Sequence, residues 1–185
     1  TENKALALSR YTKVKQQIKL KDSTGKDMAW VEAVVKSYKP DIVVLDMGDK
    51  FASKTSDKSD VYLKDAAIHA RNIAKIYNCA VIWMSQLSAD AEGVVQPNMS
   101  MMEGSKTGKA AEADLMVLIS KNRQVEGVDE EEDLTRYLTI AKNKLDGGWH
   151  GRITCELDGV GPAIVPWTDG GGWDACVVKF ETSVR

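Results

Sequence analysis

The sequence has few cysteines and histidines, and it has no long apolar segment. Its three cysteines, Cys79, Cys155 and Cys176, are odd in number and far apart, which argues against a disulfide framework and against a zinc site. Only two histidines are present, His69 and His150, so a histidine-rich metal centre is not expected. No apolar run approaches the ~20 residues that cross a membrane, and the polar N-terminus has no signal-peptide core. These features predict a protein of a reducing cytoplasm.

The net charge, the composition and the length of the chain limit the class of protein further. The net charge of -2 at pH 7 does not indicate a general nucleic-acid binder, so any DNA-binding surface must be local. With 43% hydrophobic and 28% charged residues, the composition is that of an ordinary globular protein. The 185 residues are enough for one domain with a hydrophobic core.

Residues 41–46 are expected to form the central strand. Four apolar residues in a row, three of them β-branched, predict a strand that is buried on both faces, as in a parallel sheet. The run ends in Asp46, and ligands of open α/β sheets lie at the carboxyl ends of the strands. Taken alone, the segment is more typical of a core strand that stops at a turn-forming aspartate. The alternative is a strand that delivers a Mg²⁺-binding carboxylate.

A helix and a second strand follow this segment. Leu63, Ala66, Ala70 and Ile73 recur at helical spacing within residues 61–77, which predicts an amphipathic helix. Residues 80–84 are again apolar and lead into Ser85 and Gln86. The order strand, helix, strand predicts a crossover unit with two parallel strands.

The remaining segments complete an α/β fold. We expect a mostly parallel central sheet flanked by helices, with antiparallel strands in the C-terminal third. Asp27 is the expected N-cap of a helix that ends before Pro40. Further helices are predicted over 4–18 and, briefly, over 110–113. Further strands are predicted over 114–119, 137–141, 152–157, 163–165 and 173–180.

Four segments, in this order along the chain, resemble the RecA-like ATPase core of DnaB-type replicative helicases, in particular the phage primase-helicases. The resemblance spans roughly residues 30–165, and each of the four segments is weak alone. Residues 41–46 resemble the Walker B strand, and residues 81–86 resemble the strand that ends in a γ-phosphate sensor. Residues 104–109, followed by 112–114, resemble the second DNA-binding loop. Residues 140–144, with glycines at 147, 148 and 151, resemble the motif that reaches the ATP of the neighbouring subunit.

The resemblance implies roles for individual residues. Asp46 would hold Mg²⁺, a hard ion that prefers oxygen ligands. Gln86 would hydrogen-bond the γ-phosphate and signal its loss. Ser105, Lys106 and Lys109 would face the DNA backbone, which lysines neutralise without reading bases. The alternatives are a polar residue at the end of a strand for Gln86 and a solvated basic loop for the lysines.

Two lysines stand where this family has a lysine and an arginine finger. The resemblance implies that Lys142 and Lys144 bind the nucleotide and that Lys144 takes the catalytic position. Because a lysine lacks the bidentate fork of an arginine, transition-state stabilisation by Lys144 would be weaker. Arg152 is the alternative for this role and is included among the expected nucleotide-binding residues.

The phosphate loop of the family is absent from the sequence. No G-x-x-x-x-G-K-S/T motif occurs, and the run 104–109 has the wrong spacing and does not follow a strand. The general-base glutamate of the family is expected to lie ahead of Thr1. We therefore expect residues 1–185 to be one incomplete ATPase domain, with a βα part over 1–120 and an antiparallel extension over 121–185.

The expected function is that of a fragment of an ATP-dependent DNA helicase motor in DNA replication. It would couple hydrolysis of ATP with Mg²⁺ at subunit interfaces to movement on single-stranded DNA, in a hexameric ring in the cytoplasm of a bacterial or phage-infected cell. Alone, it should hydrolyse ATP poorly or not at all. The alternatives are a non-catalytic RecA-like module for DNA binding or oligomerisation, a recombinase-type ATPase, and a general α/β domain.

Overall fold

The computed structural model describes most of the chain, and the described residues form two sheets with helices packed beside the first of them. The predicted helix over 4–18 lies largely outside the described part. The described residues are 12, 17–51, 59–104, 107–121, 134–145, 150–157, 164–166 and 177–179.

The crossover unit predicted from the sequence is present. Helix α2 (Met28–Tyr38) begins at its N-cap Asp27, whose carboxylate accepts a hydrogen bond from the Trp30 N–H at 3.0 Å. Strand β1 (Ile42–Leu45), helix α3 (Ser59–Tyr77) and strand β2 (Ala80–Trp83) follow. The two strands pair in parallel, with Leu45 opposite Trp83. The parallel pairing is therefore confirmed for these two strands.

Helices α2 and α3 cover one face of the β1–β2 pair. Their buried side chains form one core cluster with Leu45 and Phe51, and Ile73 is its most buried member on α3. The opposite face is open, because Ile42 and Val44 are 59% and 55% exposed. The prediction that the strand is buried on both faces is thus wrong for the described part of the chain. Among the described residues, helices pack against one face of this pair only.

The second sheet is antiparallel. It contains five strands in the order β3–β4–β5–β6, with β7 paired to β5 as well. The prediction of a mostly parallel central sheet is therefore correct for β1 and β2 only, since β3 pairs with β4 and joins the C-terminal strands. The strands are β3 (Leu115–Ser120), β4 (Thr135–Asn143), β5 (Gly151–Leu157), β6 (Ile164–Pro166) and β7 (Val177–Lys179).

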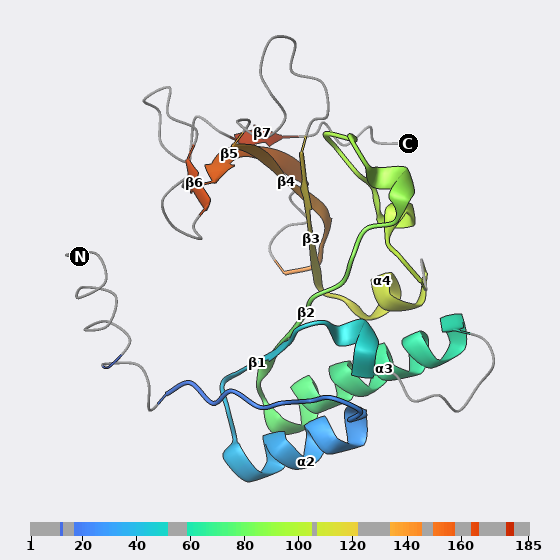
Figure 1. Cartoon of the computed structure of the whole chain (residues 1–185), viewed down its shortest axis with the longest axis vertical. Coiled ribbons are helices and arrows are strands. Elements are labelled where there is room, and N and C mark those ends of the chain that lie inside the picture. The colour runs from blue at the N-terminus through green and yellow to red at the C-terminus, as the bar shows by residue number, and fades with distance from the viewer. Residues whose placement is uncertain are drawn as a thin grey trace.

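Figure 1 shows how these parts lie in space. Helices α2 and α3 lie at one end of the molecule and the antiparallel sheet at the other, with β1 and β2 between them (Figure 1). The short helix α4 (Gly108–Glu112) leads into β3 and lies beside α3, which it contacts. None of the described helices is long and apolar enough to cross a membrane.

A polar contact joins α2 to α3 beside the core. The Glu32 carboxylate lies 2.7 Å from Nε2 of His69 and accepts a hydrogen bond from the Tyr77 hydroxyl at 3.1 Å. The hydrogen bond with His69, followed by that from Tyr77, lowers the pKa of Glu32 below its ordinary value. The charged carboxylate is therefore favoured in the folded state.

This contact predicts a pH dependence of stability. Folding lowers the pKa of Glu32, so its charged carboxylate adds to the free energy of unfolding. This contribution is fully present above the unfolded pKa of about 4.3, and it is lost as the pH falls through the lower pKa of the folded state. Urea unfolding of the wild type and of Glu32→Gln between pH 3 and pH 6 tests this. The difference in unfolding free energy should be largest at pH 6 and should shrink at the acid end. Asp65→Asn, on the exposed face of α3, is the matched control. Parallel curves for wild type and Glu32→Gln would contradict the assignment.

Candidate functional site

The carboxyl ends of β1 and β2 bring two predicted site residues to one edge. Asp46 directly follows β1, and Gln86 lies three positions beyond the end of β2. Backbone hydrogen bonds hold the two ends together, from Met84 N–H to the Leu45 carbonyl at 3.1 Å and from Gly48 N–H to the Met84 carbonyl at 2.9 Å. Both predicted side chains are exposed at this edge. The edge is therefore the candidate site.

Asp46 has the chemistry that a Mg²⁺ ion requires. Its carboxylate is exposed, and no described residue forms a hydrogen bond or an ion pair with it. In the described part, no three acidic, histidine or cysteine side chains gather into a metal cage. Mg²⁺ in nucleotide sites is bound by one or two carboxylates together with substrate phosphates, so a single free aspartate fits this ion.

Gln86 is held by its backbone, so its side chain is free to reach outward. Its carbonyl accepts a hydrogen bond from the Glu103 N–H at 3.1 Å, and the next residue, Leu87, forms a β-bridge with Met102. The Ser88 N–H also bonds the Met101 carbonyl, at 2.7 Å. The segment after β2 is thus paired with the segment that precedes Gly104. This pairing fixes Gln86 relative to the predicted DNA-binding loop.

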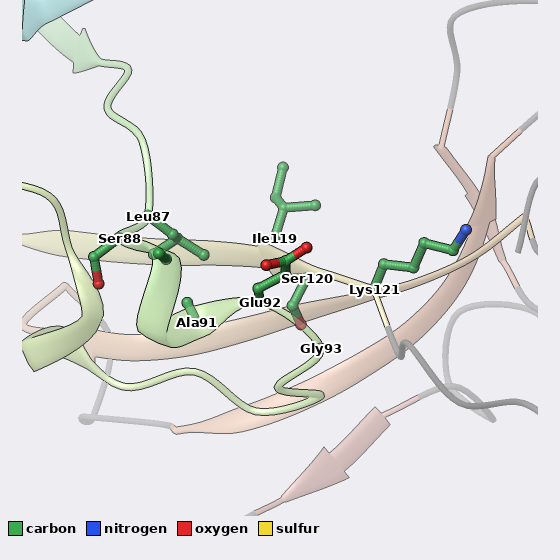
Figure 2. A pocket seen from close by; sticks show the side chains of 9 residues that line it. Leu87, Ser88, Ala91, Glu92, Gly93, Ile119, Ser120 and Lys121 are labelled. Atoms are coloured by element: carbon green, nitrogen blue, oxygen red, sulfur yellow. The ribbon is translucent and has the colours of Figure 1, made fainter.

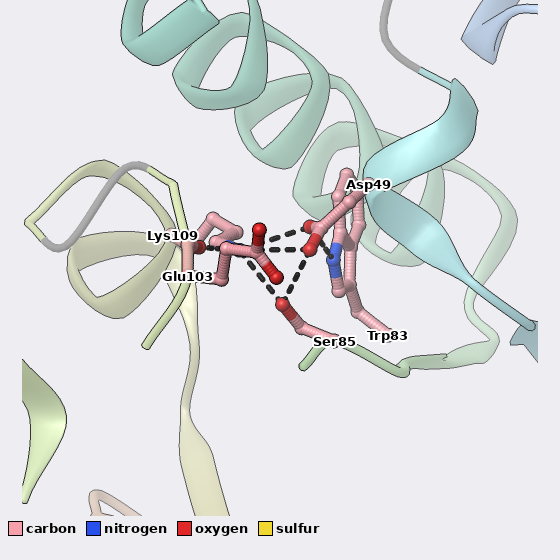
Figure 3. A network of polar contacts seen from close by, with 5 residues as sticks. All are labelled: Asp49, Trp83, Ser85, Glu103 and Lys109. Atoms are coloured by element: carbon pink, nitrogen blue, oxygen red, sulfur yellow. Dashed lines mark hydrogen bonds and ion pairs between the residues drawn. The ribbon is translucent and has the colours of Figure 1, made fainter. Parts of the chain in front are cut away.

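Lys109 was predicted to face DNA, but the structure places it inside the protein. Its side chain is only 6% exposed, and its ammonium contacts both Asp49 carboxylate oxygens, at 3.0 and 3.1 Å. It also donates to Ser85 Oγ at 2.7 Å and to the Glu103 carbonyl at 2.6 Å (Figure 3). Neither the predicted contact of Lys109 with DNA nor the alternative of a solvated loop fits this position, because oxygen atoms of the protein take all of its donors. Ser105 and Lys106 lie outside the described residues.

Asp49 is the central acceptor of this cluster. It lies on the short 3₁₀ helix Gly48–Phe51, and each carboxylate oxygen accepts from Lys109 and from one other donor. The other donors are Nε1 of Trp83 at 3.0 Å and Oγ of Ser85 at 2.6 Å. We name Asp49, Trp83, Ser85 and Lys109, with the Glu103 carbonyl, the Asp49 cluster (Figure 3).

Sequence reasoning did not single out Asp49. The available signals were its position three residues after Asp46 and the position of Ser85 directly before Gln86. A close approach adds to the constraint on this turn, because a Cβ atom on Gly48 would lie 2.4 Å from the Trp83 ring. Only glycine therefore allows the indole to lie against this turn and to reach Asp49.

Lys142 lies on β4 of the antiparallel sheet and Lys144 directly follows this strand, so neither lies on the β1–β2 edge. The Lys142 ammonium donates to the Ala110 carbonyl and, at 3.2 Å, to the Ala111 carbonyl near the end of α4. Burial lowers the pKa of Lys142 below its usual value, and the neighbouring Lys144 lowers it further while Asp114 opposes the shift. Lys144 is exposed. The two lysines are therefore neighbours, with one turned inward and one toward solvent.

Arg152 lies on β5, opposite Thr139 of β4. Its guanidinium lies over the Tyr137 ring, 5.1 Å from the ring centroid. Its Nε and the Thr139 hydroxyl are both buried without a hydrogen-bond partner among the described residues. The structure thus brings Asp46 and Gln86 together and brings Lys142 beside Lys144, whereas the contacts of Arg152 with described residues involve neither pair.

A pocket of about 380 Å³ lies elsewhere, between the segment after β2 and the end of β3. Figure 2 shows Leu87 and Ser88 toward one end of the view and Lys121 toward the other, with Glu92 and Ile119 between them. Neither Asp46 nor Gln86 lines it. We therefore place the candidate site on the chemistry of the strand ends and not on this pocket.

Comparisons with known proteins give matches among solved structures only. No family model matches the sequence, and a comparison with curated proteins finds no match. A DnaB-like replicative helicase, whose structure was described with its interactions with primase, matches with a TM-score of 0.62 at 18% identity, over 75% of this chain and 35% of the helicase chain. The ATPase domain of a second protein matches with a TM-score of 0.64 at 16% identity, over 77% of this chain and 52% of that domain.

These matches concern the fold. The chain spans about a third of the first solved structure and about half of the second. At 16–18% identity, these matches show that the backbones are arranged alike, and they do not show a shared activity. The fold of the chain resembles the RecA-like ATPase core of DnaB-type replicative helicases, as the order of its sequence motifs predicted.

Proposed function

We propose that the chain is part of an ATP-dependent DNA helicase motor that acts in DNA replication. In this proposal, residues 1–185 form one incomplete ATPase domain, with a βα part over 1–120 and an antiparallel extension over 121–185. The complete protein hydrolyses ATP with Mg²⁺ at subunit interfaces and moves on single-stranded DNA as a hexameric ring. It works in the cytoplasm of a bacterial or phage-infected cell.

One observation supports the proposal: Asp46, which has no partner among the described residues, and the exposed Gln86 stand at the same edge of a parallel strand pair in a helicase-like fold. Asp46 binds Mg²⁺ together with the nucleotide phosphates, which is the usual mode for this ion. The neutral amide of Gln86 donates a hydrogen bond to the γ-phosphate and loses it on hydrolysis. Bound Mg²⁺ would neutralise the charge that develops on the transferred phosphoryl group.

The basic side chains supply the remaining roles. Lys144, exposed beside Lys142, reaches the nucleotide of the neighbouring subunit as a point charge. Arg152 is the alternative, since its guanidinium has a buried Nε without a partner in the described part of the chain. Lys106, with Ser105, contacts the DNA backbone. The open apolar face formed by Ile42 and Val44 supports self-association, because exposed apolar patches mark interaction surfaces.

Binding of labelled oligo-dT, followed by fluorescence anisotropy, tests the DNA part of the proposal. We expect binding to single-stranded DNA that weakens as salt rises, because backbone contacts release counterions. Lys106→Ala should reduce the affinity, whereas Lys26→Ala, at an exposed turn near α2, should not. A duplex of equal length should compete poorly. Absence of binding even at low salt would overturn the proposal of a motor that moves on DNA.

Nucleotide binding and turnover test the ATP part. Because the 185 residues contain no phosphate-loop motif, we expect ATP turnover by this chain to be very slow or absent. Residual binding of a labelled ATP analogue should require Mg²⁺ and should be lost in Asp46→Ala. Asp41→Ala, at the opposite end of β1, is the control. Clear Mg²⁺-dependent turnover that Asp46→Ala abolishes would contradict the expectation of an incomplete domain.

The missing motif favours a second candidate, a non-catalytic RecA-like module that binds DNA or assembles oligomers. Such a module has no use for Mg²⁺, so its DNA binding would be the same in Asp46→Ala with or without nucleotide. The coding sequence ahead of Thr1 separates the two candidates at little cost. A G-x-x-x-x-G-K-S/T motif encoded there, in the same frame, supports the motor, and its absence supports the module.

A further inference from the structure

The Lys109 ammonium uses every donor it has. An ammonium has three N–H bonds, and the three groups that receive them are the Asp49 carboxylate, the Ser85 hydroxyl and the Glu103 carbonyl. Ser85 in turn donates its own O–H to Asp49 at 2.6 Å. The cluster is therefore closed, with each donor matched to an acceptor. Closed polar networks of this kind hold their members in one arrangement.

The members of the cluster come from the two parts of the molecule that a motor has to connect. Asp49 lies three residues after Asp46, and Ser85 directly precedes Gln86, so both belong to the nucleotide edge. Glu103 directly precedes the run 104–109 that was predicted to bind DNA, and Lys109 is the last residue of this run. A single side chain, Lys109, thus ties both ends of the DNA segment to the edge that would hold the nucleotide.

The backbone strengthens this connection. The Glu103 N–H bonds the Gln86 carbonyl at 3.1 Å, while the Glu103 carbonyl accepts from Lys109 at 2.6 Å. A displacement of the run 104–109 would therefore act on Gln86 through the Glu103 peptide and on Asp49 through the Lys109 ammonium. The indole of Trp83, which donates to Asp49 at 3.0 Å, lies at the nucleotide end of this path.

We infer that Lys109 is a positioning residue that couples the DNA-binding segment to the nucleotide edge through Asp49 and Ser85. The inference rests on the proposed function and deepens it. Lys109 does not touch DNA or nucleotide. It holds the DNA-binding segment and the nucleotide edge in a fixed relation, so that binding of a ligand at one of them changes the other.

The Trp83 indole provides a signal for this coupling. Fluorescence of the wild type is compared with that of Trp83→Phe, so that the contribution of Trp83 is isolated from the other tryptophans. Oligo-dT at saturating concentration should change the Trp83 emission in the wild type. The double variant Asp49→Asn/Lys109→Met, which leaves no unpaired charge in the cluster, should still bind oligo-dT but should lose this change. Lys75→Met, an exposed lysine of α3, should keep it.

Each outcome separates the inference from the proposed function. If the wild type does not bind oligo-dT, the proposed function fails, and the inference fails with it. If it binds without a Trp83 response, or if the double variant keeps the response, only the inference is overturned. A folded double variant that no longer binds DNA would show direct contact and would also overturn the positioning role. Should circular dichroism show the double variant unfolded, Ser85→Ala replaces it. Ser85→Ala removes one link and should diminish the response, and an undiminished response would overturn the inference.

Discussion

Replacement of Ile73 by alanine is expected to lower the free energy of unfolding by about 2–5 kcal/mol. Ile73 is 1% exposed and lies on α3 in the core that this helix shares with α2 and β1. Truncation removes buried apolar surface and leaves a cavity that the neighbouring helix and strands fill only in part. Urea unfolding followed by circular dichroism measures the loss.

The matched control for this prediction is Ile76→Ala. Ile76 lies three residues further along the same helix and is 66% exposed, so the same truncation removes little buried surface. Its expected effect is within about 0.5 kcal/mol. Similar losses for the two variants would mean that α3 does not bury the face assigned to it. The core of the β1–β2 unit would then have to lie elsewhere.

The face of α3 was predictable because its signal is local. Leu63, Ala66, Ala70 and Ile73 fall at helical spacing in the sequence, and all four are buried in the structure. The parallel pairing of β1 and β2 was predictable for a related reason, since one helix joins them in sequence. Local periodicity and short connections constrain these elements before any long-range contact is known.

The exposure of β1 and the pairing of β3 were not predictable in this way. An apolar run has the same sequence whether helices cover one face or both, so Ile42 and Val44 gave no sign that they would be exposed. The largely apolar residues 115–120 are compatible with a strand of either a parallel or an antiparallel sheet. Its pairing with β4 includes a register shift between Met116 and Val117, which depends on backbone contacts with a distant strand.

The Asp49 cluster was missed because its contacts are distant in sequence. Lys109 lies 60 residues from Asp49 and 24 from Ser85. A lysine in a glycine-containing run predicts a solvated loop unless its partners are known. Reasoning from the sequence did locate Asp46 and Gln86 at one edge, because each lies within three residues of the carboxyl end of a strand whose place in the order could be derived.

Replacement of Lys109 by methionine is expected to lower the free energy of unfolding by about 3 kcal/mol, because it leaves the partly buried Asp49 carboxylate without its cation. The side chain of Asp49 is 21% exposed, so water compensates only a part of the lost ion pair. Trp83 and Ser85 still donate to Asp49 in this variant, which places the expected loss at the lower end of the range for broken buried pairs. Urea unfolding at neutral pH measures it.

The double variant Asp49→Asn/Lys109→Met shows whether charge or packing is responsible. Because it removes both charges, it should be more stable than Lys109→Met alone, with a total loss of about 1 kcal/mol from weakened hydrogen bonds. The single variant Asp49→Asn completes the cycle, and the coupling between the two positions should be about 2 kcal/mol or more. If the losses of the two single variants simply add, Lys109 and Asp49 do not act as a pair. A strong coupling would mean that the two charges act as one unit, because each becomes costly to bury once its partner is removed. Such a unit holds the DNA segment and the nucleotide edge in a fixed relation, since neither side chain can leave the cluster without exposing the other to this cost.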